Sequence, residues 1–139
     1  MGARHKSREA AVAILYQLDM VREKDPGKAV AEYFATENPE SAQMEFVSSM
    51  VTGVVSRIDE IDAKIGPLLV NWEFARLGYM ERAILRLGTY EILFDATIPG
   101  AVAVDEAVEL AKDFCDADSA GFINGVLDKL AKEKQPSGS

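Results

Sequence analysis

The sequence predicts an all-α protein built from two helical lobes that share one core. Apolar residues recur three or four positions apart through most of the chain, which places them on one face of a helix. The longest such series consists of Val47, Met50, Val54, Ile58, Ile61 and Ile65. No sustained alternation of apolar and polar residues indicates strands, and no internal repeat or flexible linker divides the chain. We therefore expect a single domain over residues 1–139.

Three helices are expected in an N-terminal lobe of about residues 1–66. The first spans Ala10 to Val21 and ends before Asp25-Pro26-Gly27, because proline disfavours the α conformation in the residue before it. A short helix from Lys28 to Thr36 follows. Asn38-Pro39 is typical of a helix start. The helix behind it is expected to continue for about seven turns, until Gly66-Pro67.

A C-terminal lobe of about residues 67–132 is expected to hold about four helices. The first is a short apolar helix around Leu68 and Trp72, and the second runs from Met80 to about Asp95. Ile98-Pro99-Gly100 separates the second from the third, which ends near Phe114. Residues 116–119 offer turn and cap residues before the last helix, and residues 133–139 form a polar tail.

Composition excludes several classes of protein. The 139 residues are 48% hydrophobic and 27% charged, which is typical of one globular domain. One cysteine and one histidine cannot form an intrachain disulfide or a zinc cage of His and Cys ligands. No apolar run reaches the roughly 20 residues that span a bilayer. We expect a soluble protein of the cytoplasm, with no membrane association.

The charge is unevenly distributed. The net charge is −8, yet residues 1–8 contain Arg4, Lys6 and Arg8 and no acid. These eight residues carry +3, so the remainder carries −11. An acidic body repels polyanions except at its basic corner, which could bind a short nucleic acid locally. The alternative is a basic tip that is merely solvated.

No catalytic constellation is evident. Cys115 stands beside Asp116, a setting that disfavours a thiolate, and His5 is the only imidazole. Neither a GxGxxG nor a P-loop motif occurs. Acid pairs such as Asp105-Glu106 lack the ligand spacing of a calcium-binding loop. We expect no enzyme activity, no cofactor and no metal.

Three stretches of the chain resemble a known family. They are residues 8–17 with REA and AILYQ, residues 82–93 with RAILRL and YEIL, and residues 104–129 with VDEAVELAK, DS and FINGVLDK. Their order and spacing are similar to those of the bacterial NusB family of transcription antitermination proteins, over about residues 4–132. The resemblance implies an all-helical fold of two lobes and a non-enzymatic role.

The resemblance also implies the partners. NusB-like proteins bind the single-stranded boxA element of nascent RNA together with NusE, a ribosomal protein. The complex helps RNA polymerase read through terminators in ribosomal RNA operons. The chain departs from the family at Asp105, often Asn, at Cys115, often Gly, and in an N-terminus with fewer arginines. Some relatives self-associate, so a homodimer stays open.

Single-stranded RNA requires cations for phosphates and flat side chains for base faces. Arg4, Lys6 and Arg8 are the candidate phosphate partners. Tyr16 lies two turns after Arg8 and is either a core residue or part of the RNA surface. Arg86 lies largely outside the apolar stripe of its helix and is either solvated or an RNA contact.

The start of the last helix is a second candidate RNA surface. Asp118 is expected to cap this helix and could also accept a hydrogen bond from a base amino group. Phe122 is either a core residue or a stacking surface. For the basic ribosomal partner, we expect an acidic surface that includes Glu81, Glu91 and Asp95.

Two other functions stay open. One is a helical protein-binding or self-associating module without RNA binding, which the small basic cluster permits. The other is a regulatory domain related to those that precede the catalytic part of certain ribosomal RNA cytosine methyltransferases. The chain lacks a recognisable cofactor-binding region, which fits this second alternative poorly.

Overall fold

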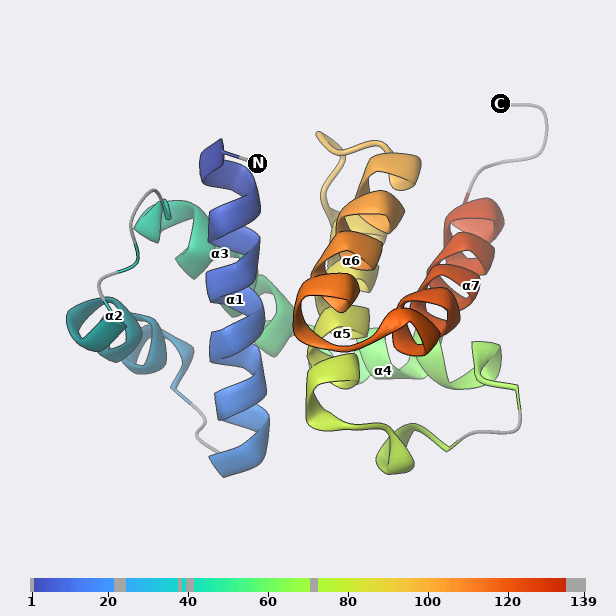
Figure 1. Cartoon of the computed structure of the whole chain (residues 1–139), viewed down its shortest axis with the longest axis horizontal. Helices are drawn as coiled ribbons and strands as arrows, with labels where there is room; N and C mark the ends of the chain where they lie inside the picture. Colours follow the sequence, from blue (N-terminus) through green and yellow to red (C-terminus); the bar gives the residue numbers. More distant parts are fainter. Residues whose placement is uncertain (1, 22–24, 38, 40–41, 71–72, 135–139) are drawn as a thin grey trace.

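The computed structural model describes residues 2–21, 25–37, 39, 42–70 and 73–134. Over these residues the chain forms helices joined by turns, and it contains no strand (Figure 1). The α-helices are α1 (Gly2–Val21), α2 (Pro26–Glu37), α3 (Met44–Ser56), α4 (Ile58–Ile65), α5 (Tyr79–Phe94), α6 (Gly100–Phe114) and α7 (Ala117–Lys134). Two short 3₁₀ helices, η1 (Gly66–Leu68) and η2 (Phe74–Arg76), lie between α4 and α5. The predicted all-α class is confirmed.

Helix α5 organises the packing. It contacts α1, α3, α4, α6 and α7, while α2 packs on α3 and α1 (Figure 1). One continuous apolar cluster runs through these contacts and includes Val12, Val54, Ile84 and Leu127. Gly88 of α5 permits the close approach of α7, because a Cβ at this position would clash with Leu127. The helices of both halves of the chain therefore share one core.

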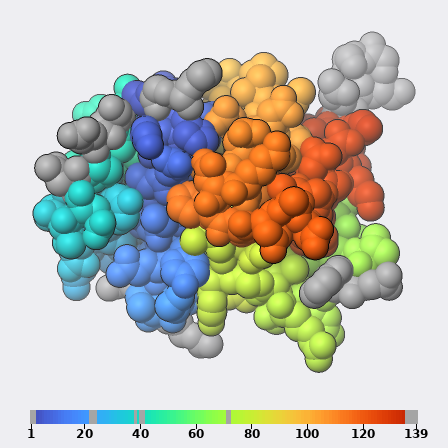
Figure 2. Space-filling model, in the orientation of Figure 1, coloured from blue at the N-terminus to red at the C-terminus, as the bar shows by residue number. Residues whose placement is uncertain are grey.

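Helices α1 and α5 run antiparallel. Arg8 near the start of α1 contacts Glu91 near the end of α5, and Asp19 near the end of α1 contacts Arg82 near the start of α5. Helix α6 also reaches α1, and the two lie side by side on the face shown in Figure 2. Ion pairs therefore join α1 to α5 near both ends of their contact, and a further pair joins α1 to α6.

The first helix is longer than its apolar stripe predicts. Helix α1 begins at Gly2, so the basic segment that was expected to precede the helix forms its first two turns. Ala, Arg, Lys and Glu favour helix, and Ser7 and Arg8 are buried against the rest of the protein. An apolar stripe that begins at residue 10 cannot reveal a helix whose first buried residues are polar.

The prediction of one seven-turn helix is wrong, because the helix is interrupted at Arg57. This residue has φ −120° and ψ 22°, and it separates α3 from α4. The apolar series passes through the break because one non-helical residue leaves the spacings of three and four unchanged. Helix α3 also begins at Met44, later than expected from Pro39, and α4 packs on α5.

The remaining helices lie close to their predicted ranges. Helix α5 differs from its prediction by one residue at each end, and α6 begins directly after Pro99. The short apolar helix is a single 3₁₀ turn, since η1 ends at Leu68, and Trp72 lies outside the described residues. Helix α7 extends into the predicted polar tail. None of the helices in the described ranges is long and apolar enough to cross a membrane.

Candidate nucleic-acid interface

The exposed cations at the start of α1 form a basic corner. Arg4 and Lys6 are both exposed, as predicted. The guanidinium of Arg4 lies over the ring of Phe46 on α3, with its Cζ 3.6 Å from the ring centroid. Lys6 Nζ lies 3.4 Å from Glu9 Oε1. Stacking on Phe46 holds Arg4 without neutralising its charge, so this cation can still bind a phosphate.

Arg8 does not belong to this exposed corner, which corrects the prediction. Its side chain is only 7% exposed, and its Nε donates to both carboxylate oxygens of Glu91, at 3.0 and 3.2 Å. Its Nη1 lies 3.5 Å from Glu106 Oε1. Four residues after Arg4, the helix has turned this side chain towards α5 and α6. Arg8 therefore joins helices and offers no free charge to a phosphate.

Glu91 is likewise misplaced in the predicted acidic surface, because it is 2% exposed. Burial raises the pKa of its carboxyl above the ordinary value, and the adjacent Arg8 guanidinium opposes that rise. A buried carboxylate of this kind requires its arginine, since an unpaired charge in the core is costly. Glu91 serves the α1–α5 contact and cannot meet a partner protein.

Aromatic side chains surround the other end of the α1–α5 contact. The rings of Tyr16 and Tyr79 meet edge to face, with centroids 6.3 Å apart. Tyr79 is 41% exposed, and the Cζ of Arg82 lies 4.6 Å from its ring centroid. Tyr16 itself is half-buried and packs against the core, and its role as an RNA contact stays a prediction. Its neighbour Tyr79 presents a flat surface to the solvent.

Arg86 belongs to an ordered network with Arg82. Arg86 donates to both oxygens of Asp62, from Nε at 2.9 Å and from Nη2 at 2.8 Å. Asp19 Oδ2 accepts from Arg82 Nη2 at 2.7 Å and lies 3.3 Å from Arg86 Nη1. The ring of Phe74 packs beside both guanidinium groups. Two arginines and two aspartates balance in charge, which leaves a hydrogen-bonded and nearly neutral cluster.

Asp118 and Phe122 line a hollow at the start of α7, of about 470 Å³. Its other walls include Leu77 and Gly78, which lead into α5, and Glu81 in the first turn of α5. Ser119 Oγ donates to Glu81 Oε2 at 2.9 Å, which ties the start of α7 to the first turn of α5. The hollow thus joins an exposed carboxylate, Asp118, to the half-buried ring of Phe122.

Asp118 is not the cap of α7, which corrects a further prediction. The backbone N–H of Ser119 donates to Asp116 Oδ1 at 2.8 Å, so Asp116 caps the helix. Hydrogen bonds from Ser119 and Asp118 hold the pKa of the Asp116 carboxyl below its usual value. Asp118 stands in the first helical turn and is exposed. Its carboxylate is therefore not engaged in capping the helix.

The predicted acidic residues do not form one surface. Glu81 lies at the start of α5, while Asp95 follows its end and accepts from the backbone N–H of Thr97 at 3.0 Å. Asp95 comes fourteen positions after Glu81, which corresponds to about 21 Å along the helix axis.

The single cysteine, Cys115, is not activated. Burial, together with the nearby carboxylates of Glu81 and Asp116, raises the pKa of the Cys115 thiol to about 11, which disfavours a nucleophilic thiolate.

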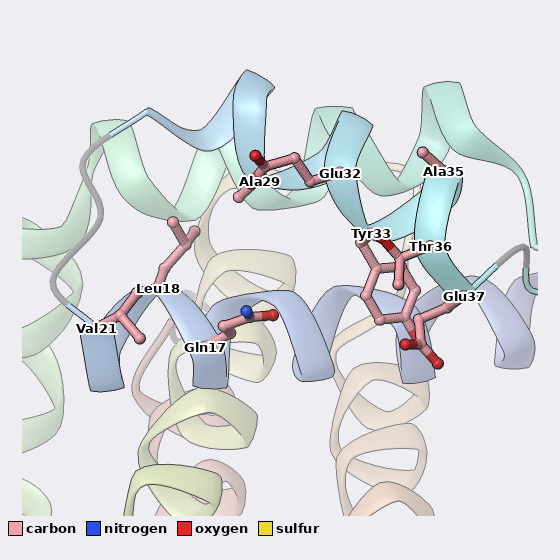
Figure 3. Close-up of a pocket in the computed structure, with 9 residues that line it drawn as sticks. All are labelled: Gln17, Leu18, Val21, Ala29, Glu32, Tyr33, Ala35, Thr36 and Glu37. Atoms are coloured by element: carbon pink, nitrogen blue, oxygen red, sulfur yellow. The ribbon is translucent and has the colours of Figure 1, made fainter.

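Another hollow lies between α1 and α2 (Figure 3). Its volume is about 390 Å³, and Glu32 and Glu37 are the charged residues in its lining. Burial and the neighbouring Glu37 and Glu9 raise the pKa of Tyr33, which also lines it. Because the described residues of its wall include acids and no cation, this part of the hollow does not suit a polyanion.

The sequence missed several residues of the candidate interface. Tyr79 and Arg82 precede the predicted Arg86 at spacings of three and four, so their common helix face could have been found from the sequence. The stacking of Arg4 on Phe46 could not, because the two residues come from separate helices. The seven predicted RNA contacts thus lie in separate places. Arg4 and Lys6 are at the exposed corner, Tyr16 and Arg86 are in the aromatic and arginine network, and Asp118 and Phe122 line the hollow. The seventh, Arg8, is buried.

Comparisons with known proteins identify the family. The sequence model of the NusB family matches residues 5–132. The transcription antitermination protein NusB of Wolinella succinogenes is 42% identical over 130 residues, which cover 94% of this chain and 95% of the relative. That of Campylobacter hominis is 38% identical over 134 residues, covering 96% of this chain and 100% of the relative.

Solved structures agree with this match. A crystal form of T. maritima NusB superposes with a TM-score of 0.85 at 34% identity, over 98% of this chain and 96% of that one. A crystal structure of the antitermination factors NusB and NusE in complex with double-stranded RNA superposes with a TM-score of 0.83 at 33% identity. The match covers 94% of this chain and 97% of that one. This chain belongs to the NusB family of transcription antitermination proteins.

Proposed function

We propose that this protein is a transcription antitermination factor that binds single-stranded boxA-type RNA together with the ribosomal protein NusE. The observation that carries the assignment is the basic corner of Arg4 and Lys6, which an otherwise acidic NusB-family chain leaves exposed. The bound complex would join RNA polymerase in the cytoplasm and promote its passage through terminators in ribosomal RNA operons. The protein acts by binding and carries out no catalysis.

Each part of the candidate interface has a different role in this proposal. Arg4 and Lys6 attract phosphates, which gives affinity without sequence preference. Tyr16 and Arg86 lie close to Tyr79 and Arg82, and the exposed ring of Tyr79 can stack with a base. Asp118 accepts a hydrogen bond from a base amino group, and Phe122 beside it offers a second flat surface.

The division of labour with NusE follows from the charge. A net charge of −8 with two exposed cations at the α1 corner predicts weak RNA binding by this chain alone. A basic ribosomal protein would supply further cations, and acidic residues such as Glu81 and Asp95 would attract it. Because these two acids lie at opposite ends of α5, either the partner covers a long surface or only one of them contacts it.

RNA titrations with and without the partner test this proposal. A boxA-containing RNA oligonucleotide should bind weakly to this protein and several-fold more tightly when NusE is saturating. A scrambled oligonucleotide of the same composition should gain less from NusE. If NusE left boxA affinity unchanged, joint binding would be wrong. If the chain bound NusE and never RNA, it would instead be a protein-interaction module.

A further inference from the structure

A histidine and two carboxylates meet where the start of α1 crosses the end of α6. His5 and Glu9 stand one turn apart on α1, so their side chains share a face. Asp113 reaches them from the last turn of α6. One ligand atom from each residue lies within 4.8 Å of the other two. Asp113 lies 108 positions after His5 in the sequence, so no local motif predicts the whole cluster.

The distances suit a tetrahedral metal. His5 Nε2 lies 3.1 Å from Asp113 Oδ2 and 3.5 Å from Glu9 Oε2. Zinc binds nitrogen and carboxylate oxygen at roughly 2.0–2.2 Å, and ligands at tetrahedral angles are then about 3.3 Å apart. The two separations from His5 lie on both sides of that value, and the Glu9 and Asp113 oxygens lie within 4.8 Å of each other. Small side-chain movements would therefore suffice to coordinate an ion.

The second nitrogen of the imidazole is also oriented. His5 Nδ1 faces Glu106 Oε1 at 3.5 Å. A metal-bound histidine commonly donates its other N–H to a carboxylate, which fixes the ring and strengthens the ligand. Glu106 is in turn 3.5 Å from Arg8 Nη1, which offsets part of its charge. The cluster thus has an outer group in the position that a metal site requires.

Lys6 pairs with one carboxylate oxygen of Glu9 and leaves the oxygen that faces His5 available to a metal ion. Lys6 Nζ approaches Glu9 Oε1, whereas Oε2 faces His5. Asp113 is 44% exposed at its side chain, so an ion can enter from the solvent, and water can complete the coordination. An imidazole with two carboxylates favours a transition metal over calcium or magnesium, which prefer oxygen ligands alone.

We propose that His5, Glu9 and Asp113 bind one Zn²⁺ ion, which links the start of α1 to the end of α6. The bound ion would hold the N-terminal turn in place beside Arg4 and Lys6. The site is independent of RNA and of NusE. Its residues lie outside the proposed RNA contacts, so either proposal can fail without the other.

Calorimetric titration of Zn²⁺ into metal-free protein without an affinity tag tests the site directly. We expect one ion per chain, a rise in melting temperature with zinc, and no comparable binding of Ca²⁺. Cobalt in place of zinc should give the visible absorption of a tetrahedral or five-coordinate site. Failure to bind Zn²⁺ at one equivalent per chain would overturn the proposal.

Matched variants locate the ligands. Glu106→Gln should weaken zinc binding by about 10- to 100-fold, the usual effect of an outer group. His5→Ala and Asp113→Asn remove ligands and should weaken it further. Asp105→Asn loses the same charge from an exposed position of α6 and should bind zinc like the parent. Cys115→Ser should also retain binding.

Two outcomes contradict the assignment to these residues. Unchanged affinity in folded His5→Ala, checked by circular dichroism, would place the ion elsewhere. Loss of binding in Cys115→Ser alone would assign the ion to the thiol. Should His5→Ala fail to fold, the double variant Glu9→Gln with Asp113→Asn removes two ligands and leaves the imidazole in place, and full affinity in that variant would equally overturn the proposal.

Discussion

Arg4 and Arg8 stand one helical turn apart on α1, yet the protein uses them in opposite ways. Arg4 is exposed and stacks on Phe46, whereas Arg8 is buried and bound to the buried carboxylate of Glu91. Four residues along a helix turn the side-chain direction by about 400°, which is about 40° more than one full turn. Arg4 therefore meets α3, whereas Arg8 meets α5 and α6. The comparison shows that a count of basic residues overstates the charge available to RNA.

The same contrast separates two arginine networks along the α1–α5 contact. Arg8 and Glu91 form a nearly solvent-free pair, whereas Arg82 and Arg86 keep some contact with water while they bind Asp19 and Asp62. A buried pair depends on both partners, because either charge alone in the core is strongly unfavourable. A partly hydrated network loses less when one member is removed.

Removal of Arg8 should have the largest effect on stability. Arg8→Ala leaves Glu91 buried without its partner, and we expect the free energy of unfolding to fall by about 3–5 kcal/mol. Arg4→Ala, the matched exposed arginine, should cost less than about 1 kcal/mol. Urea denaturation of both variants measures the difference. Equal losses would show that the buried pair has no special role.

Removal of Arg86 should have an intermediate effect. Arg86→Ala breaks two hydrogen bonds to Asp62 and a contact with Asp19, in a partly hydrated setting. We expect a loss of about 1–2 kcal/mol in the same denaturation experiment. A loss as large as that of Arg8→Ala would mean that this network is effectively as desolvated as the buried pair.

The two aspartates at the start of α7 provide a smaller comparison. Asp116→Ala removes the helix cap and should lower the free energy of unfolding by about 1 kcal/mol. Asp118→Ala should leave stability within about 0.5 kcal/mol, because this residue is exposed and does not cap. Thermal or urea unfolding distinguishes them. The reverse order would return the cap to Asp118 and contradict the observed geometry.

The smallest effect concerns the pH dependence of this cap. The pKa of Asp116 is lower in the folded protein than its ordinary value of 3.8. The cap therefore contributes its full stability above that value and loses it as the pH falls through the folded pKa. Relative to Asp116→Asn, which does not titrate, the parent should lose stability between about pH 5 and pH 2. A constant difference across this range would exclude the linkage.

The sequence predicted most of the fold because apolar spacing reports helices with apolar faces. The spacing failed where polar residues are buried, as at Ser7 and Arg8, and where one residue, Arg57, interrupts a helix without changing the pattern. It also assigned Glu91 to a partner surface, although this residue stands four positions after Leu87 in the apolar series of its helix. The arginine that makes its burial possible, Arg8, comes from another helix. Exposure depends on partners from other helices, which a single sequence does not display.

The candidate interface was predictable to a similar degree. Arg4 and Lys6 followed from the charge distribution, while Asp118 and Phe122 followed from the family resemblance together with the helix start. The pairing of Tyr16 with Tyr79 required the antiparallel packing of α1 on α5. The cluster of His5, Glu9 and Asp113 required the crossing of α1 and α6, and the sequence accordingly predicted no metal site.

The salt dependence of RNA binding tests most directly the claim that exposed cations of α1 contact phosphates. With saturating NusE, the double variant Arg4→Gln with Lys6→Gln should bind boxA RNA more weakly. Its slope of log affinity against log salt should be shallower by about 1.4, as expected for two lost phosphate contacts. The control, Lys129→Gln with Lys132→Gln on α7, loses the same charge and should keep the parent slope. Equal slopes for the two double variants would contradict the account.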